Sequence, residues 1–160
     1  MLLSRASRTA LFLALLFGGA IEFQPSTGLA QAQNLFGRST LAVISATGRH
    51  QFNIEVAATP SQRSQGLMWR RSLAPNAGML FDFDAPEPVT MWMKNTYIGL
   101  DMLFIGDDGR IVNIARNTTP HSLAMISSLG PVRAVLELAA GTAERLGLRA
   151  GDRIEHGLFR

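Results

Sequence analysis

The chain has 160 residues, of which 47% are hydrophobic and 17% charged, and this length and composition predict one globular domain rather than a disordered protein. Its formal net charge at pH 7 is only +3, and the basic residues form no stripe along the sequence, so nucleic-acid binding is not expected. Cysteine is absent, which excludes disulfides, zinc–thiolate sites and a cysteine nucleophile.

The N-terminus predicts a secretory signal peptide over residues 1–32. Two arginines precede an apolar run over residues 10–21, and Ala30-Gln31-Ala32 has the small–x–small pattern of a cleavage site. A second cleavage frame lies two residues earlier. The alternative is an uncleaved anchor, for which the run is shorter than the roughly 20 apolar residues that span a membrane. We therefore expect a periplasmic or secreted protein whose mature part, residues 33–160, is one domain without a stable membrane span.

The first half of the mature chain predicts two strands and a short helix. The segments over residues 40–46 and 51–57 are rich in valine and isoleucine, and the connection between them is typical of a hairpin. A helix is predicted from Thr59 to about Arg70. Thr59 is a suitable N-cap, followed by proline at the first helical position and by glutamine at the capping-box position.

The second half predicts further short strands. Both faces of residues 100–105 are apolar, which predicts a central strand covered on each side. Loops are predicted over residues 84–88 and 117–131, and a short helix over residues 142–146. The remaining strands are predicted over residues 77–83, 90–95, 110–115 and 132–138 and after Gly151. This pattern favours a mainly β fold, either a compact sandwich or jelly roll or a small barrel with one or two short helices.

A lysine within an apolar segment marks a candidate site. Lys94 is the only lysine of the chain and lies in Met91-Trp92-Met93-Lys94-Asn95-Thr96. A buried charge must be paired or hydrogen-bonded, because an unpaired one is strongly unfavourable. If this segment is extended, Lys94 and Trp92 share one face of a strand. A chain reversal after it would then bring Asp101 or Glu137 to Lys94, and either carboxylate would keep the ammonium charged.

Three interpretations of this cluster stay open. The first is a binding or accessory domain in which Lys94 holds a small anionic ligand or an envelope protein partner, and Trp92 forms an apolar wall. The second is an enzyme of unknown reaction type that uses Lys94 and Asp101; it is less expected, because no nucleophile motif is present. The third is a structural cluster that fixes a buried corner. The candidate ligand-binding residues are Trp92, Lys94, Asn95, Thr96, Asp101 and Glu137, and no catalytic residue is assigned.

Methionine suggests a further possibility, a Cu(I) site. Thioethers select Cu(I), and Met91, Met93 and Met102 are the candidate ligands. Methionine is also a common filler of protein cores, and core packing is the default interpretation. The histidines of the mature chain lack the spacing of zinc ligands, and no cofactor is predicted.

Several short motifs occur in a distinctive order. They are Gly66-Leu67-Met68, Gly78-Met79-Leu80-Phe81, Trp92-Met93-Lys94-Asn95-Thr96, Leu100-Asp101, Asp108-Gly109, Val135-Leu136-Glu137-Leu138 and Ala140-Gly141. In this order and spacing, over roughly residues 50–156, they resemble the bacterial and archaeal family called domain of unknown function 192 (DUF192). The resemblance implies a mainly β domain of sandwich or jelly-roll type and almost nothing about activity, since the family is uncharacterised. The chain departs from the family at Gly99, where proline is usual, so a bend is permitted there rather than enforced.

Overall fold

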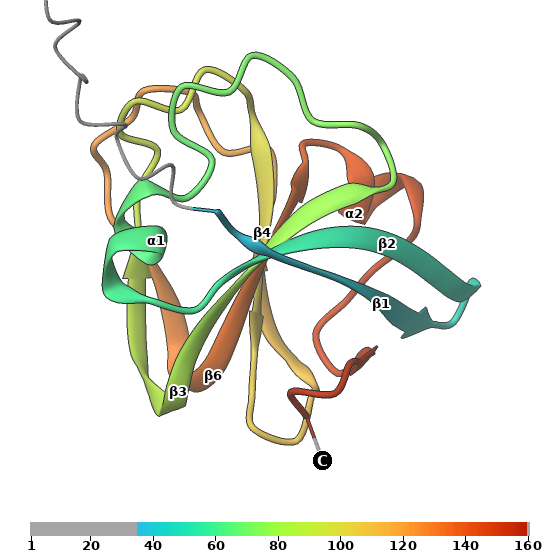
Figure 1. The fold of residues 1–160 in the computed structure, drawn as a ribbon. Helices are drawn as coiled ribbons and strands as arrows, with labels where there is room; N and C mark the ends of the chain where they lie inside the picture. The colour runs from blue at the N-terminus through green and yellow to red at the C-terminus, as the bar shows by residue number, and fades with distance from the viewer. Residues whose placement is uncertain (1–34, 160) are drawn as a thin grey trace, which may run out of the picture. The chain divides into compact units, whose positions relative to one another are not determined.

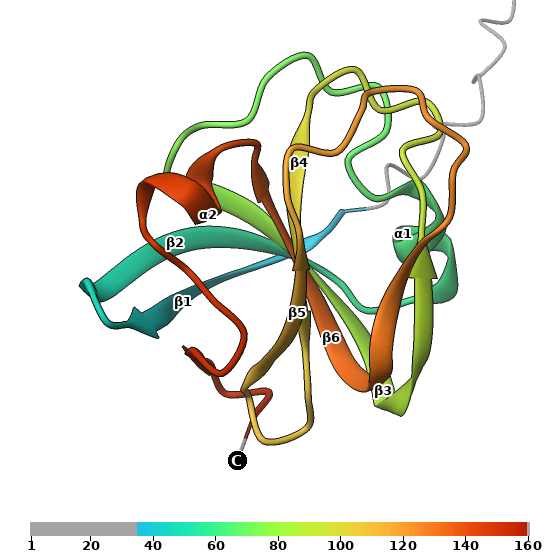
Figure 2. The same ribbon diagram turned by 180° about the vertical axis from the view of Figure 1, so that it is seen from behind.

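The computed structural model describes residues 35–159, so the predicted signal peptide over residues 1–32 lies outside the described residues. Seven strands in this part of the chain form one sheet, in the order β5-β4-β6-β3-β2-β1-β7 (Figure 1). The strands are β1 (Gly37–Ser45), β2 (Gly48–Ala57), β3 (Ala77–Met91), β4 (Leu100–Ile105), β5 (Ile111–Ala115), β6 (Ile126–Ala139) and β7 (Arg153–Glu155). Figures 1 and 2 show the sheet curled into a half-barrel, with helix α1 (Pro60–Gln65) on one side and α2 (Thr142–Arg145) on the other. The predicted mainly β fold of small-barrel type with two short helices is confirmed.

The first two strands form the predicted hairpin. They pair antiparallel through a turn at Ala46 and Thr47, because their alternating apolar residues bury one face. A crossover that contains α1 then leads to β3, which pairs with β2 in parallel. The site described below lies beside this crossover.

Helix α1 begins as its sequence predicts and ends earlier. Thr59 Oγ1 accepts a hydrogen bond from Gln62 N at 3.2 Å, and Gln62 Oε1 accepts one from Thr59 N at 3.0 Å, so the predicted capping box is confirmed. The helix ends at Gln65 rather than near Arg70, because Gly66 leaves the helical conformation with φ 47°.

Strands β3 and β6 are longer than predicted. Strand β3 continues through the predicted loop over residues 84–88, and its pairing with β6 shifts register twice between Asp82 and Thr90. The prolines of this segment have no N–H to donate to the ladder, so the strand is irregular there. Strand β6 begins at Ile126, inside the predicted loop over residues 117–131, because it pairs with this extension of β3.

The predicted strand over residues 90–95 is wrong beyond Met91, where β3 ends. The chain turns instead: Thr96 N donates to Met93 O at 3.1 Å, and Asn95 has φ 56°. Asparagine adopts this left-handed conformation with less strain than most residues. The side chains of the segment therefore do not alternate between two faces, as an extended strand would require.

Two apolar clusters cover the two faces of the sheet. All six residues of β4 are buried, which confirms the prediction of a strand covered on each side. The first cluster includes Leu136 and also Ala143 of α2, and the second includes Met102 and Val135. Because side chains alternate along a strand, Glu137 lies on the face of the second cluster with Val135.

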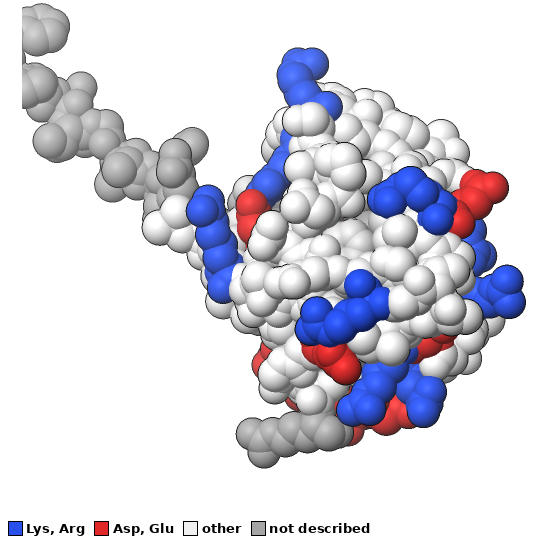
Figure 3. All heavy atoms as spheres, turned by 90° about the vertical axis from the view of Figure 1, so that its right-hand side faces the viewer, with Lys and Arg blue, Asp and Glu red and all other residues white. Residues whose placement is uncertain are grey.

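The charged side chains on one face of the molecule are mixed in sign. Figure 3 shows basic groups beside acidic groups on one face, separated by uncharged surface. Ion pairs join Arg49 to Glu155 at 3.2 Å and Arg110 to Asp108 at 3.8 Å. Over the described range, no helix combines the length and the apolar character that crossing a bilayer requires.

Candidate functional site

A cavity of about 350 Å³ opens on the face of the second cluster, between α1 and the end of β3. Its apolar wall includes Leu67, Met68, Phe81, Phe83 and Trp92. Its charged lining residues are Arg63, Lys94 and Glu137, and Thr96 adds a hydroxyl. The site therefore combines side chains from α1, from β3 and the turn after it, and from β6.

Lys94 lies on the turn that follows β3, and its side chain is exposed. Its Nζ is 5.2 Å from the centroid of the Trp92 ring, a cation–π distance. Backbone hydrogen bonds fix the turn from outside, since Trp69 N donates to Asn95 O at 2.8 Å and Met93 N donates to the carbonyl oxygen of Ser122 at 3.1 Å. The backbone that carries Lys94 is thus tied to two other segments beside the cavity.

Of the neighbouring residues in the predicted cluster, Trp92 and Thr96 line the cavity and Asn95 does not. Trp92 is 50% exposed and lines the cavity, as does Thr96, which is 5% exposed. The Thr96 hydroxyl donates to the carbonyl oxygen of Lys94 at 3.3 Å, which supports the turn from inside. Asn95 does not line the cavity; its amide lies 3.9 Å from the sulfur of Met68, and its contribution is its backbone conformation.

The predicted pair between Lys94 and Asp101 does not form. Asp101 pairs with Leu138 in the sheet, whereas Met102 pairs with Glu137, so Asp101 points to the opposite face from Glu137. Its carboxylate is fully buried and already has two donors, since Oδ1 accepts from Asn117 N at 2.8 Å and Oδ2 accepts from Ala143 N at 2.7 Å. Asp101 therefore ties β4 to the next loop and to α2.

Glu137 is the deepest polar group of the cavity. It lies near the centre of β6, between Met79 of β3 and Met102 of β4, and is only 3% exposed. Within residues 35–159 its carboxyl has neither a hydrogen-bond partner nor an ion-pair partner, so the predicted pair with Lys94 is also wrong. No side-chain oxygen or nitrogen in the described part is both sealed from solvent and unpartnered, so the oxygens of Glu137 must reach the cavity.

Burial sets the protonation state of Glu137. Desolvation disfavours the charged form and raises the pKa of this carboxyl from 4.5 to about 8. At neutral pH the group is therefore mostly protonated and neutral. It can donate one hydrogen bond into the cavity in this state, and an opposite charge placed close to it would favour its charged form.

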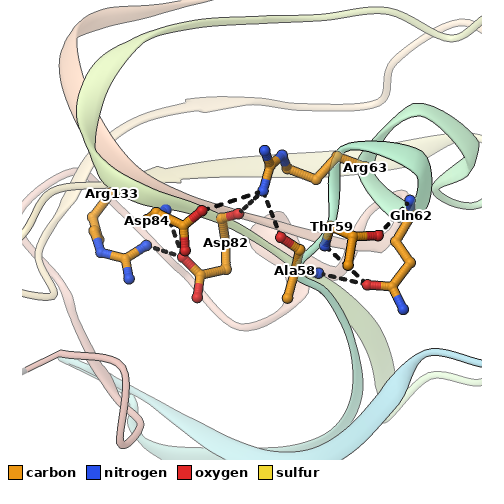
Figure 4. Close-up of polar contacts among 7 residues, drawn as sticks. All are labelled: Ala58, Thr59, Gln62, Arg63, Asp82, Asp84 and Arg133. Carbon is orange, nitrogen blue, oxygen red and sulfur yellow. Dashed lines mark hydrogen bonds and ion pairs between the residues drawn. The ribbon is translucent and has the colours of Figure 1, made fainter.

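Arg63 also lines the cavity. The sequence did not predict this role, because it indicates only that Arg63 lies in the predicted helix. Figure 4 shows its guanidinium reaching from α1 to β3, where Nη1 donates to the carbonyl oxygen of Asp82 at 2.6 Å and lies 3.9 Å from Oδ2 of Asp84. The same nitrogen donates to Ala58 O at 2.7 Å, and the carboxylate of Asp82 is paired with Arg133. These contacts, all made by Nη1, hold α1 against β3.

The candidate copper ligands are packed in the core. Met93 and Met102 are fully buried in the second cluster together with Met79, and Met91 packs against this cluster. The sulfur of Met93 lies 3.1 Å from the Thr118 hydroxyl oxygen. Copper binding stays a prediction. Nowhere from residue 35 to 159 do three histidine, aspartate or glutamate side chains form a group that could hold a metal ion.

Comparisons with known proteins agree with the motif pattern. The model of the DUF192 family, described as "Uncharacterized ACR", matches residues 42–156. A crystal structure of a candidate transcription regulator from Sinorhizobium meliloti 1021 is similar with 53% identity and a TM-score of 0.75, over 78% of this chain and 97% of that one. A protein of unknown function from Novosphingobium aromaticivorans DSM 12444 is similar with 38% identity and a TM-score of 0.74, over 83% of this chain and 90% of that one. The search of curated proteins gives no match. The chain belongs to the DUF192 family.

Proposed function

We propose that this protein is an exported binding domain whose cavity beside α1 takes a small molecule with an anionic group. The anionic group contacts Lys94, and the apolar body of the ligand lies against Phe81, Phe83 and Trp92. A cavity of about 350 Å³ with a mostly apolar wall and a few polar groups has the character of a small-molecule site. Export rests on the N-terminal sequence, and the mixed surface charge of Figure 3 gives no reason to include nucleic acid.

The observation that carries the proposal is the state of Lys94. A lysine that served only to fix a buried corner would be sealed from solvent and paired with a carboxylate. Lys94 is instead exposed, lines the cavity and has no ion pair in the described part of the chain. The tryptophan ring and the anchored turn pre-position the ammonium group, which lowers the entropy cost of binding an anion.

The same observation separates binding from the other interpretations. A catalytic pair of Lys94 and Asp101 has no support, because Asp101 lies on the other face and is occupied by two backbone donors. A structural cluster requires Lys94 to stabilise the fold, whereas its exposed position gives it little to contribute. Replacing Lys94 with methionine should therefore leave the melting temperature unchanged or raise it.

The test is native mass spectrometry of the mature protein, purified gently from the envelope of its own host. Wild type, Lys94→Met and Arg149→Met are compared; Arg149 is exposed and does not line the cavity, so its variant controls for loss of a surface cation. We expect one small organic adduct on the wild type and on the control, and its loss from Lys94→Met. An adduct that all three proteins retain, a protein partner in its place, or bare protein in all three would contradict the proposal. A clear fall in the melting temperature of Lys94→Met would favour the structural interpretation.

A further inference from the structure

Two groups that can carry opposite charge line the same cavity without contacting each other. Lys94 is exposed at the turn after β3, and Glu137 is buried on β6. They form no ion pair, and among the described residues neither has a partner of opposite charge elsewhere. The ammonium group of Lys94 lies over the ring of Trp92, and Glu137 lies between the strands on either side of β6.

No basic side chain of the described residues forms an ion pair with Glu137. Its sheet neighbours on β3 and β4 are Met79 and Met102, which are fully buried and apolar. The charged groups that face the cavity from other elements are Arg63 of α1 and Lys94. Arg63 already donates to two carbonyl oxygens, at 2.7 and 2.6 Å. An unpartnered carboxyl that reaches a cavity costs stability and is typical of a position that a ligand completes.

We propose that the ligand is a small zwitterion, with an anionic group at Lys94, a cationic amine at Glu137, and an apolar body between them along the aromatic wall. This inference rests on the proposed function and adds the second contact. A second anionic group beside Glu137 would be repelled once Glu137 ionises, whereas an ammonium group can pair with its carboxylate, which has no ion-pair partner among the described residues. Glu137 then releases its proton to solvent, and the ligand amine keeps its own.

The probes are chosen to measure the two ends separately. 4-Aminobutanoate, 6-aminohexanoate and 8-aminooctanoate carry both charges at graded separations. Hexanoate carries only the anionic end and hexylamine only the cationic end. Binding is followed by NMR titration, which detects weak complexes, and by calorimetry at pH 7 in two buffers of different ionisation enthalpy, which counts released protons.

We expect at least one of the amino acids to bind wild type about tenfold or more tightly than either single-ended probe, with proton release. Glu137→Gln should reduce this affinity to that of hexanoate, abolish the proton release and leave hexanoate binding unchanged. Lys94→Met should reduce it to that of hexylamine. Glu87→Gln changes an exposed glutamate outside the cavity and should bind as wild type does.

The outcomes distinguish the two proposals. Hexanoate and the amino acids could bind wild type with equal affinity, lose affinity in Lys94→Met and keep it in Glu137→Gln. This result overturns the zwitterion inference and supports the anion site at Lys94. If no probe binds to wild type, both proposals fall. The glutamine variant is isosteric with the protonated carboxyl, so it is expected to fold, and its NMR spectrum verifies this before each titration.

Discussion

The buried carboxyl of Glu137 makes the stability of this protein depend on pH in an unusual direction. Its pKa rises from 4.5 to about 8 because burial disfavours the charged form. The folded state thus holds the proton more tightly than the unfolded state, and the stability that this group contributes is lost as pH rises from 4.5 to about 8. At about 1.4 kcal/mol per pH unit, the loss in the free energy of unfolding is roughly 3 kcal/mol at pH 7 and roughly 5 kcal/mol above pH 8.

Replacing Glu137 with glutamine removes this titration and keeps the shape of the neutral acid. We expect the variant to be about as stable as wild type near pH 4.5, more stable by roughly 3 kcal/mol at pH 7, and by roughly 5 kcal/mol at pH 9. Urea denaturation at the three pH values measures the free energy of unfolding. Glu87→Gln, an exposed change on β3, controls for the loss of one negative charge.

The pH dependence of the difference is the decisive quantity, because glutamine can add a constant offset of its own. A difference between Glu137→Gln and wild type that stays constant from pH 4.5 to pH 9 would refute the reasoning, since it would mean that Glu137 titrates alike in the folded and unfolded states. A difference that shrinks as pH rises would show instead that the folded protein stabilises the carboxylate. If Glu87→Gln changed the free energy of unfolding by the same amount at each pH, the pH dependence would come from the overall charge of the protein and not from the burial of Glu137.

Two further substitutions test the parts of the fold that position the site. Asp101→Ala should lower the free energy of unfolding by roughly 3 kcal/mol, because the backbone N–H groups of Asn117 and Ala143 lose their acceptors; an unchanged urea midpoint would show that water replaces the carboxylate. Gly78→Ala should cost about 1–3 kcal/mol or more, since a Cβ there would lie 2.8 Å from a main-chain carbonyl oxygen of β6. In Gly37→Ala the nearest atom is 3.8 Å away, so this matched strand variant should melt as wild type does.

The elements that the sequence predicted well are those that depend on neighbouring residues. The capping box at Thr59 is complete within four residues, and the apolar run of β4 needs no partner to be recognised. The turn after β3 is different, because its apex at Asn95 is held by a hydrogen bond from Trp69, which lies far away in the sequence. The sequence does not show this long-range hydrogen bond, so the apolar pattern of residues 90–95 predicts a strand. The prediction is wrong because the bond from Trp69 favours a turn.

The candidate site was also predictable only where it depends on neighbouring residues. The proximity of Lys94 and Trp92 was predicted, although it arises from a turn and not from a shared strand face. The choice between Asp101 and Glu137 was not predictable, because it depends on the register of β4 against β6. A shift of one residue would place these two carboxylates on the same face of the sheet. The pattern of the sequence fixes register only weakly where both faces are apolar.

Strand β6 joins two parts of the sheet that no other strand connects directly. It lies between β3 and β4, so the sub-sheet of β1, β2 and β3 and the hairpin of β4 and β5 share no ladder until β6 joins them. Before that step, β3 and β4 are two open edges, which invite pairing with other chains. Because these contacts link distant parts of the sequence, folding is expected to be slow, on the order of milliseconds to seconds. Any nascent or truncated chain that stops short of β6 therefore lacks both the floor of the cavity and protection against aggregation.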